Sequence, residues 1–211
     1  VTGEIAFISP RVKTAADSMR LSLMVGLKNS EARFRNIFIP ELVSDGLRNW
    51  LDLHIHQGLL PEVGFVFHGP TQKDAIDAKV VQLWLNINDA TLSYADKWPQ
   101  IEHIDGEFLL DDRFGFARID RATTQDVAIN SADFRLFPVA GDQAIEVTGK
   151  AETSASQALR FLQNDALAEI MNNALADWQV NAGKVSSDIT VSLSLGKAET
   201  SPQVKVSSRL Q

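Results

Sequence analysis

The chain of 211 residues contains no cysteine. This absence excludes a disulfide framework, a thiolate metal site and a cysteine nucleophile. It leaves the compartment open, because a chain without cysteine is compatible with both the cytosol and the periplasm. Hydrophobic residues make up 45% of the chain, which is enough for a core in one large domain or two small ones.

Basic charge and long apolar runs are also scarce. The net charge is −7 and no lysine or arginine cluster is present, which argues against a nucleic-acid partner. No apolar run approaches the roughly 18 residues of a transmembrane helix. The opening residues, "VTGEIAFISPRV", lack the charged start and the apolar block of a signal peptide. They read as the interior of a longer chain, so we expect a fragment whose anchor or signal lies outside it.

Motifs of catalysis and nucleotide binding are missing as well. The sequence has no Walker loop, no G-x-G-x-x-G and no G-x-S-x-G elbow. Asp111 and Asp112, with Asp105 and Glu107 nearby, have the residue type of a glycosidase carboxylate pair. A polar sheet face that ends in an acidic turn explains them more simply. The sequence therefore indicates no enzyme and no catalytic residue.

The histidines give no clear metal site. His54 and His56 lie in a segment with helical spacing, where residues two apart diverge by about 200° around the axis. An extended segment would bring them closer, but the sequence places no third ligand beside them. We expect an exposed helix end there and no bound metal. His68 and His103 are expected to be solvated or hydrogen-bonded.

What the sequence does contain is alternation of apolar and polar residues, which is typical of strands with one buried face. In one example Leu83 and Leu85 alternate with Gln82 and Trp84. The alternating segments are "MRLSLMVGL", "SEARFRNIFI", "GFVFHG", "KVVQLWLNIN", "RFGFARI", "DVAINSADFRLF", "QAIEVTGKAE", "VSSDITVSLSL" and "QVKVSSRL". Together with the segments around residues 89–112 they predict a mainly β fold, in which ten or so antiparallel strands form a curved sheet.

Two segments have helical spacing instead. The first, residues 41–57, follows Pro40 and stops before Gly58, as helices often do. The second, residues 156–179, has a wide apolar stripe, and Asn164 or Asp165 is expected to divide it because both residues cap helices well. The two segments resemble degenerate copies of one unit.

The tryptophans are assigned mostly to the interior. Trp50 and Trp178 are expected in the core, because each lies near the end of a helical segment. Trp84 is on the more polar side of its strand, so we expect a helix to cover that side. Pro99 is expected at a strand end or in a loop, since it cannot donate to a ladder. The neighbouring Trp98 is expected to cap the sheet edge at that corner.

Several motifs follow one another along the chain in a definite order. They are Pro40, Leu47 to Leu51, Phe65 to Gly69, Asp89 to Ala90, Tyr94, Trp98 to Pro99, and Ile104 to Phe108. This order resembles that of the large AsmA-like envelope proteins, most closely the YhdP branch, and the resemblance covers most of residues 37–195. Asp165, Ala166 and Leu167 stand where that branch commonly has serine-proline-leucine.

This resemblance implies a piece of a long periplasmic protein built from repeating β-groove (taco-like) units. Such proteins are anchored in the inner membrane outside this fragment and conduct phospholipids toward the outer membrane. Residues 1–211 are then a single fragment, with approximate units 1–88 and 89–211. Phospholipid is the implied ligand and envelope proteins are candidate partners, with no catalytic residue, metal or cofactor.

Alternation and the resemblance together give a set of candidate residues for a lipid-binding groove. The candidates are Phe65, Phe67, Leu83, Leu85, Ile87, Phe108 and Leu110. Three alternatives stay open: a rigid spacer or assembly module whose apolar faces are buried under helices, a β-sandwich that binds glycans through Trp84 or Trp98, and, last, an enzyme.

Overall fold

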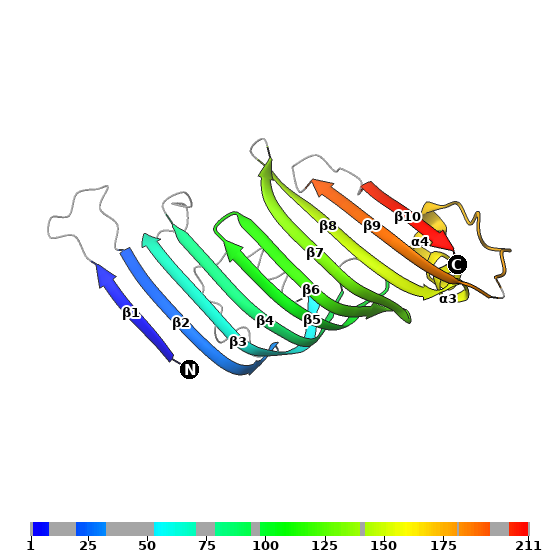
Figure 1. Cartoon of the computed structure of the whole chain (residues 1–211). Coiled ribbons are helices and arrows are strands. Elements are labelled where there is room, and N and C mark those ends of the chain that lie inside the picture. Colours follow the sequence, from blue (N-terminus) through cyan, green and yellow to red (C-terminus); the bar gives the residue numbers. More distant parts are fainter. Residues whose placement is uncertain are drawn as a thin grey trace.

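A computed structural model describes residues 2–8, 20–32, 53–70, 79–93, 98–139, 142–180, 182–194 and 203–210. Within these residues ten strands form a single antiparallel sheet, in which each strand pairs with the strand before it and the strand after it (Figure 1). The strands are β1 (Thr2–Ile8), β2 (Arg20–Glu31), β3 (Ile55–Pro70), β4 (Val80–Leu92), β5 (Ile101–Asp111), β6 (Phe114–Thr124), β7 (Val127–Val139), β8 (Asp142–Ser154), β9 (Lys184–Ser194) and β10 (Gln203–Leu210). The prediction of a curved antiparallel sheet with ten or so strands is confirmed.

Not every predicted element can be compared with the structure. Most of the strand predicted over residues 30–39, the first helix up to residue 52 with Trp50, and Tyr94 lie outside the described residues. The division into units 1–88 and 89–211 stays a prediction. β1 has no counterpart in the sequence-based prediction, although it pairs with β2 along its whole length.

The end of the first helical segment was predicted wrongly. Leu53 and His54 are helical, but β3 begins at Ile55 and includes the residues up to 57. Ile55 and Gln57 are paired with Leu92 and Thr91 of β4. The ladder therefore outweighs the local helical spacing at these three residues.

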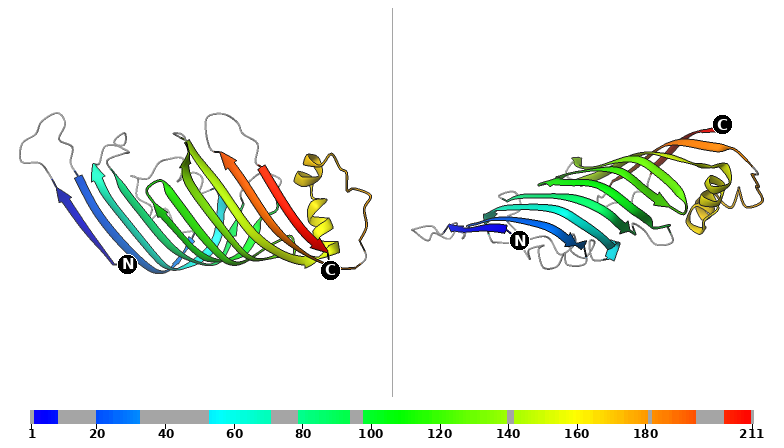
Figure 2. Two further views of the ribbon diagram at one scale, coloured as in Figure 1. Left: turned by 45° about the horizontal axis from the view of Figure 1, so that its top comes forward. Right: turned by 60° about the horizontal axis from the view of Figure 1, so that its bottom comes forward.

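The second helical segment divides as predicted. α3 (Ala155–Leu162) begins after a capping box, in which the Gln157 N–H donates to Ser154 Oγ at 3.2 Å and the Ser154 N–H donates to Gln157 Oε1 at 3.2 Å. α4 (Asp165–Ile170) begins after Asn164, whose Oδ1 accepts from the Leu167 N–H at 3.1 Å. Both helices lie at the end of the sheet that holds β8, β9 and β10 (Figures 1 and 2).

The predicted continuation of this helix to residue 179 is wrong. Turns follow Ile170, and Asn172 and Asn173 adopt left-handed backbone with φ of 51° and 56°, which ends the helix. Trp178 therefore lies beyond the helix and is 61% exposed, so its assignment to the core is wrong too.

The sheet is bent along a line of β-bulges that crosses several strands. We call this line the crease and define it as residues 87–92 of β4, 101–106 of β5 and 119–122 of β6. The register shifts there between β4 and β5 and again between β5 and β6. Asp89 and His103 have left-handed φ values of 52° and 53°. Because bulges bend a strand and increase its twist, they account for the curl seen at the lower ends of β3 and its neighbours in Figure 1.

Candidate functional site

One face of the sheet is apolar from β2 to β10. The strand registers align a row that takes one residue from each of these strands, and every residue in the row is apolar. The row is Leu27, Val63, Leu85, Phe108, Ala117, Phe134, Val147, Val191 and Val204. Directly opposed side chains on neighbouring strands contact one another, so the row forms a continuous strip.

Two flanking rows extend this strip on both sides. One contains Val25, Phe65, Leu83, Leu110, Gly115, Leu136, Ile145 and Leu193. The other contains Ile87, Gly106, Ile119, Ala132, Gly149, Ile189 and Val206. We call the three rows the apolar face, and the opposite side of the same strands the outer face.

All seven sequence-predicted groove residues belong to the apolar face or continue it. Leu85 is paired with Phe108, and Leu83 with Leu110. Phe67 is paired with Leu23 and Val81. The period of two thus identified residues that share one face of β3, β4 and β5. Sequence reasoning did not select its continuation across β6 to β10, although the same alternation marks it.

Burial divides the apolar face into a closed part and a more open part. Phe67 and Phe65 on β3 are only 1% and 5% exposed, so they are core residues. Leu85 and Phe108 are half-buried, as are the other predicted residues of β4 and β5. At β10, Val204 and Val206 are more than half exposed. The apolar face is therefore most accessible away from β3.

The described helices do not lie across the middle of this face. α3 contacts β7, β8 and β9, and α4 contacts α3. In both views of Figure 2 the two helices lie at the end of the sheet that holds β8, β9 and β10. Within the described residues, Leu85 and Phe108 are therefore not buried under a helix.

The outer face is largely polar. It carries exposed ion pairs between neighbouring strands, Lys28 with Glu62 at 3.9 Å and Arg118 with Glu107 at 3.8 Å. Such exposed pairs contribute little to stability. They do show that this side of the sheet faces water, whereas the opposite side is apolar.

The apolar face is on the concave side of the bend. Ala90, Ile104 and Ala122 form a buried cluster at the crease. The neighbouring His103 and Arg121 point to the outer face and are exposed. Side chains on the inside of a bend are crowded, whereas those on the outside are open to solvent. The buried cluster therefore lies on the inside of the bend, and the curled sheet is a trough whose inner wall is apolar.

Trp84 is the largest apolar side chain on the outer face. Within the described part of the chain no helix covers it, and because most of the first helical segment lies outside the described residues, the expected helical cover stays a prediction. It is half-buried and lies against β3 at Gly64, where an added Cβ would be 3.8 Å from its ring atom Cε3. The glycine leaves room for the ring, and Leu109 is its partner on β5.

The second tryptophan, Trp98, is half-buried and lies in the connection between β4 and β5. The expected place of Pro99, outside the strand ladder, is confirmed, because β5 begins at Ile101. The role of Trp98 as a cap of the sheet edge stays a prediction.

The predicted titratable residues do not gather into a chemical site. His56 Nε2 is 2.6 Å from Ser93 Oγ, and His68 Nδ1 is 2.6 Å from Ser22 Oγ. The described residues contain no group of three or more side chains that could hold a metal ion.

The two acidic residues at the end of β5 are bound to β4. Asp111 accepts from Gln82 Nε2 at 2.9 Å. Asp112 accepts from the Val81 N–H at 2.7 Å. Both carboxylates therefore fasten the β5–β6 turn to its neighbouring strand, in agreement with the simpler of the two interpretations.

The fold and its two unlike faces define a class of protein: an open, curled antiparallel sheet with an apolar concave side. The chain belongs to the YhdP family, whose family model, described as YhdP protein, matches residues 4–211. This is a family of AsmA-like proteins of the cell envelope. Comparison with curated proteins and with solved structures found no match. None of the helices described here has the length and apolar character needed to cross a membrane.

Proposed function

We propose that this chain is a segment of an envelope bridge that shields the acyl chains of phospholipids along its apolar face. The observation that carries the proposal is the unbroken apolar row from Leu27 on β2 to Val204 on β10. We further propose a periplasmic location and an inner-membrane anchor elsewhere in the parent chain, as the family resemblance implies. The proposal includes no catalytic step and no cofactor.

The energetics favour an apolar trough for this task. Each buried methylene contributes about 0.8 kcal/mol, so an acyl chain of 16 carbons loses on the order of 12 kcal/mol when it is exposed to water. Strands lie about 4.8 Å apart, so nine strands span roughly 38 Å from β2 to β10. The hydrocarbon core of a bilayer is about 30 Å thick and holds two layers of chains. The apolar face is thus long enough for a whole acyl chain.

The spacer alternative is supported by one observation. Phe65 and Phe67 are almost completely buried, so the apolar face at β3 is closed. If the half-buried part from β4 to β9 also contacts no lipid, the same residues serve only to stabilise a rigid sheet. A charge placed on the apolar face therefore distinguishes the lipid-shielding function from the spacer function.

The experiment compares two neighbouring residues that point to opposite faces of β5. Phe108→Asp places a charge on the apolar face, and Leu109→Asp places the same charge on the outer face, where Leu109 is 45% exposed. Phospholipid that co-purifies with each variant is measured by native mass spectrometry, and folding is checked by thermal melting. Burying an unpaired charge beside acyl chains is costly. We expect bound phospholipid in the wild type and in Leu109→Asp, and its loss in folded Phe108→Asp.

Two outcomes would contradict the proposal. Absence of phospholipid from the wild-type protein would favour the spacer. Equal retention of phospholipid in both variants would show that the lipid does not lie on the apolar face. Leu85→Asp repeats the test from β4, because Leu85 is the direct partner of Phe108.

A further inference from the structure

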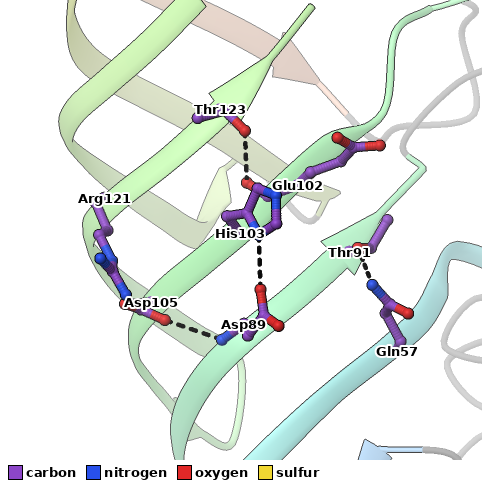
Figure 3. Close-up of polar contacts among 8 residues, drawn as sticks. All are labelled: Gln57, Asp89, Thr91, Glu102, His103, Asp105, Arg121 and Thr123. Carbon is purple, nitrogen blue, oxygen red and sulfur yellow. Dashed lines mark hydrogen bonds and ion pairs between the residues drawn. The ribbon is translucent and has the colours of Figure 1, made fainter. Parts of the chain in front are cut away.

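The crease is held on its outer side by a polar network that joins β4, β5 and β6 (Figure 3). Asp105 is at its centre: Oδ1 accepts from the Asp89 N–H at 2.9 Å, and Oδ2 accepts from Arg121 Nε. His103 Nδ1 donates to Asp89 Oδ1 at 2.7 Å. The Asp105 side chain is 16% exposed, whereas those of the other three residues are mostly exposed.

The bulge in β4 explains why a carboxylate is needed at this point. Ile87 is paired with Gly106 and Ala90 with Ile104, so two residues of β4 stand opposite the single residue Asp105. The Asp89 N–H is thereby removed from the ladder, and a backbone N–H without an acceptor costs free energy. Asp105 supplies the missing acceptor.

The electrostatics agree with this role. The pKa of Asp105 is below its ordinary value, first because the Asp89 N–H donates to the carboxylate, while burial acts in the opposite direction. The hydrogen bond and charge of Arg121, and then the charge of His103, lower the pKa further. The hydrogen bond from the bulge is thus the largest single cause of the lowered pKa.

The bulge also keeps the apolar face continuous. Ile87 and Ala90 are three residues apart, so in a regular strand they would point to opposite faces. The extra residue of the bulge returns Ala90 to the side of Ile87, where Ile87 packs against the buried cluster that contains Ala90 and Ile104.

We infer that Asp105 is a positioning residue that fixes the bulge of β4, and with it the curl of the sheet and the course of the apolar face through the crease. Outside this network, Gln57 Nε2 donates to Thr91 Oγ1 at 3.1 Å, which joins β3 to β4, and Thr123 Oγ1 donates to the Glu102 carbonyl at 3.4 Å, which is a further bond between β6 and β5. The consequence for acyl chains rests on the proposed function; the consequence for the curl does not.

The test measures the curl directly. Because the chain has no cysteine, spin labels can be attached at Arg113→Cys and Gln125→Cys, two exposed turn residues that flank β6 on the two sides of the crease. Pulsed electron paramagnetic resonance gives the distance between the labels, and amide exchange reports on the Asp89 N–H. In Asp105→Ala we expect a longer and broader distance distribution, and roughly tenfold or faster exchange at Asp89.

Further variants separate the hydrogen bond from other effects. Asp105→Asn keeps an oxygen acceptor, and Arg121→Ala leaves the Asp105 carboxylate in place, so both should retain the wild-type distance. Asp111→Ala is the matched control. It removes a carboxylate from the same face of β5, and the hydrogen bond of that carboxylate to β4 comes from the side chain of Gln82. It should also retain the wild-type distance.

An unchanged distance in Asp105→Ala, or an equal change in Asp111→Ala, would overturn the inference. If Asp105→Ala does not fold, Asp105→Asn decides: a wild-type distance supports the inference and a lengthened one overturns it. Both readouts are made without lipid. A lack of bound phospholipid would therefore refute the proposed function alone, and the inference about Asp105 would be judged by the label distance.

Discussion

Replacing Gly106 by alanine should disrupt the packing of β5 against β6 at the crease. Gly106 lies in β5 directly after the register shift at Asp105, opposite Ile119 of β6. A Cβ at this position would be 2.2 Å from the Arg118 carbonyl oxygen and 3.0 Å from Ile119 Cα. Both atoms belong to the backbone, so no side-chain rotation can relieve the contact.

The expected magnitude follows from this geometry. Overpacking by a methylene typically costs 1–3 kcal/mol, and here the strands themselves must separate, so we expect a loss of about 3 kcal/mol. Gly64→Ala in β3 is the matched control. Its Cβ would meet only Trp84 Cε3, at 3.8 Å, which is an ordinary contact. Because alanine also restricts the unfolded chain, this variant should remain within about 1 kcal/mol of the wild type.

The assay is thermal and denaturant unfolding of the two variants beside the wild-type protein. A chain of this size loses about 2–4 °C of Tm for each kcal/mol, so Gly106→Ala should melt roughly 6–12 °C lower and Gly64→Ala close to the wild type. Equal Tm values for the wild type and Gly106→Ala would refute the argument that β5 and β6 are in close backbone contact at the crease.

Three further changes test other parts of the structure. Phe67→Ala should destabilise the fold by about 3–5 kcal/mol in denaturant unfolding. Phe114→Ala changes a residue that is 58% exposed, so it should cost less than about 1 kcal/mol. Similar losses in the two variants would show that β3 is not the closed part of the apolar face. Because the hydrogen bond from the Asp89 N–H lowers the pKa of Asp105 in the folded protein, its contribution to stability is present above the pKa of the unfolded chain and is lost as the pH falls through the lower folded value. Asp105→Asn should therefore reduce the slope of stability against pH below about pH 4, and an unchanged slope would contradict this. Ser154→Ala removes the capping box of α3 and should cost about 1 kcal/mol, measured as faster amide exchange in that helix; unchanged exchange would count against the cap.

The strands and the choice of face were predictable because alternation is a local property. Leu85 and Phe108 could be assigned to one side without any knowledge of the sheet, since each lies in a regular strand. The same rule fails at a bulge. Ala90 belongs to the side of Ile87 only because the chain inserts an extra residue, and the sequence near Asp89 gives no measure of that insertion.

Other features left a signal that was open to more than one interpretation. The glycine in "IDGEF" is typical of a bulge or a close backbone approach, which is what Gly106 makes. The adjacent Asn172 and Asn173 are good left-handed residues, but they lie within an apolar stripe that favours a longer helix. Ile55 shows the limit of local spacing, because its conformation depends on pairing with Leu92, far away in the sequence.

The most direct test of the apolar face as a lipid path is photocrosslinking from single phenylalanine positions in the cell envelope. A benzophenone side chain at Phe108 or Phe134 lies on the apolar face, and the same side chain at Phe114 lies on the outer face of a neighbouring strand. Our account predicts crosslinks to phospholipid from Phe108 and Phe134 and none above background from Phe114. Crosslinks of equal yield from all three positions, or none from Phe108 and Phe134, would contradict it.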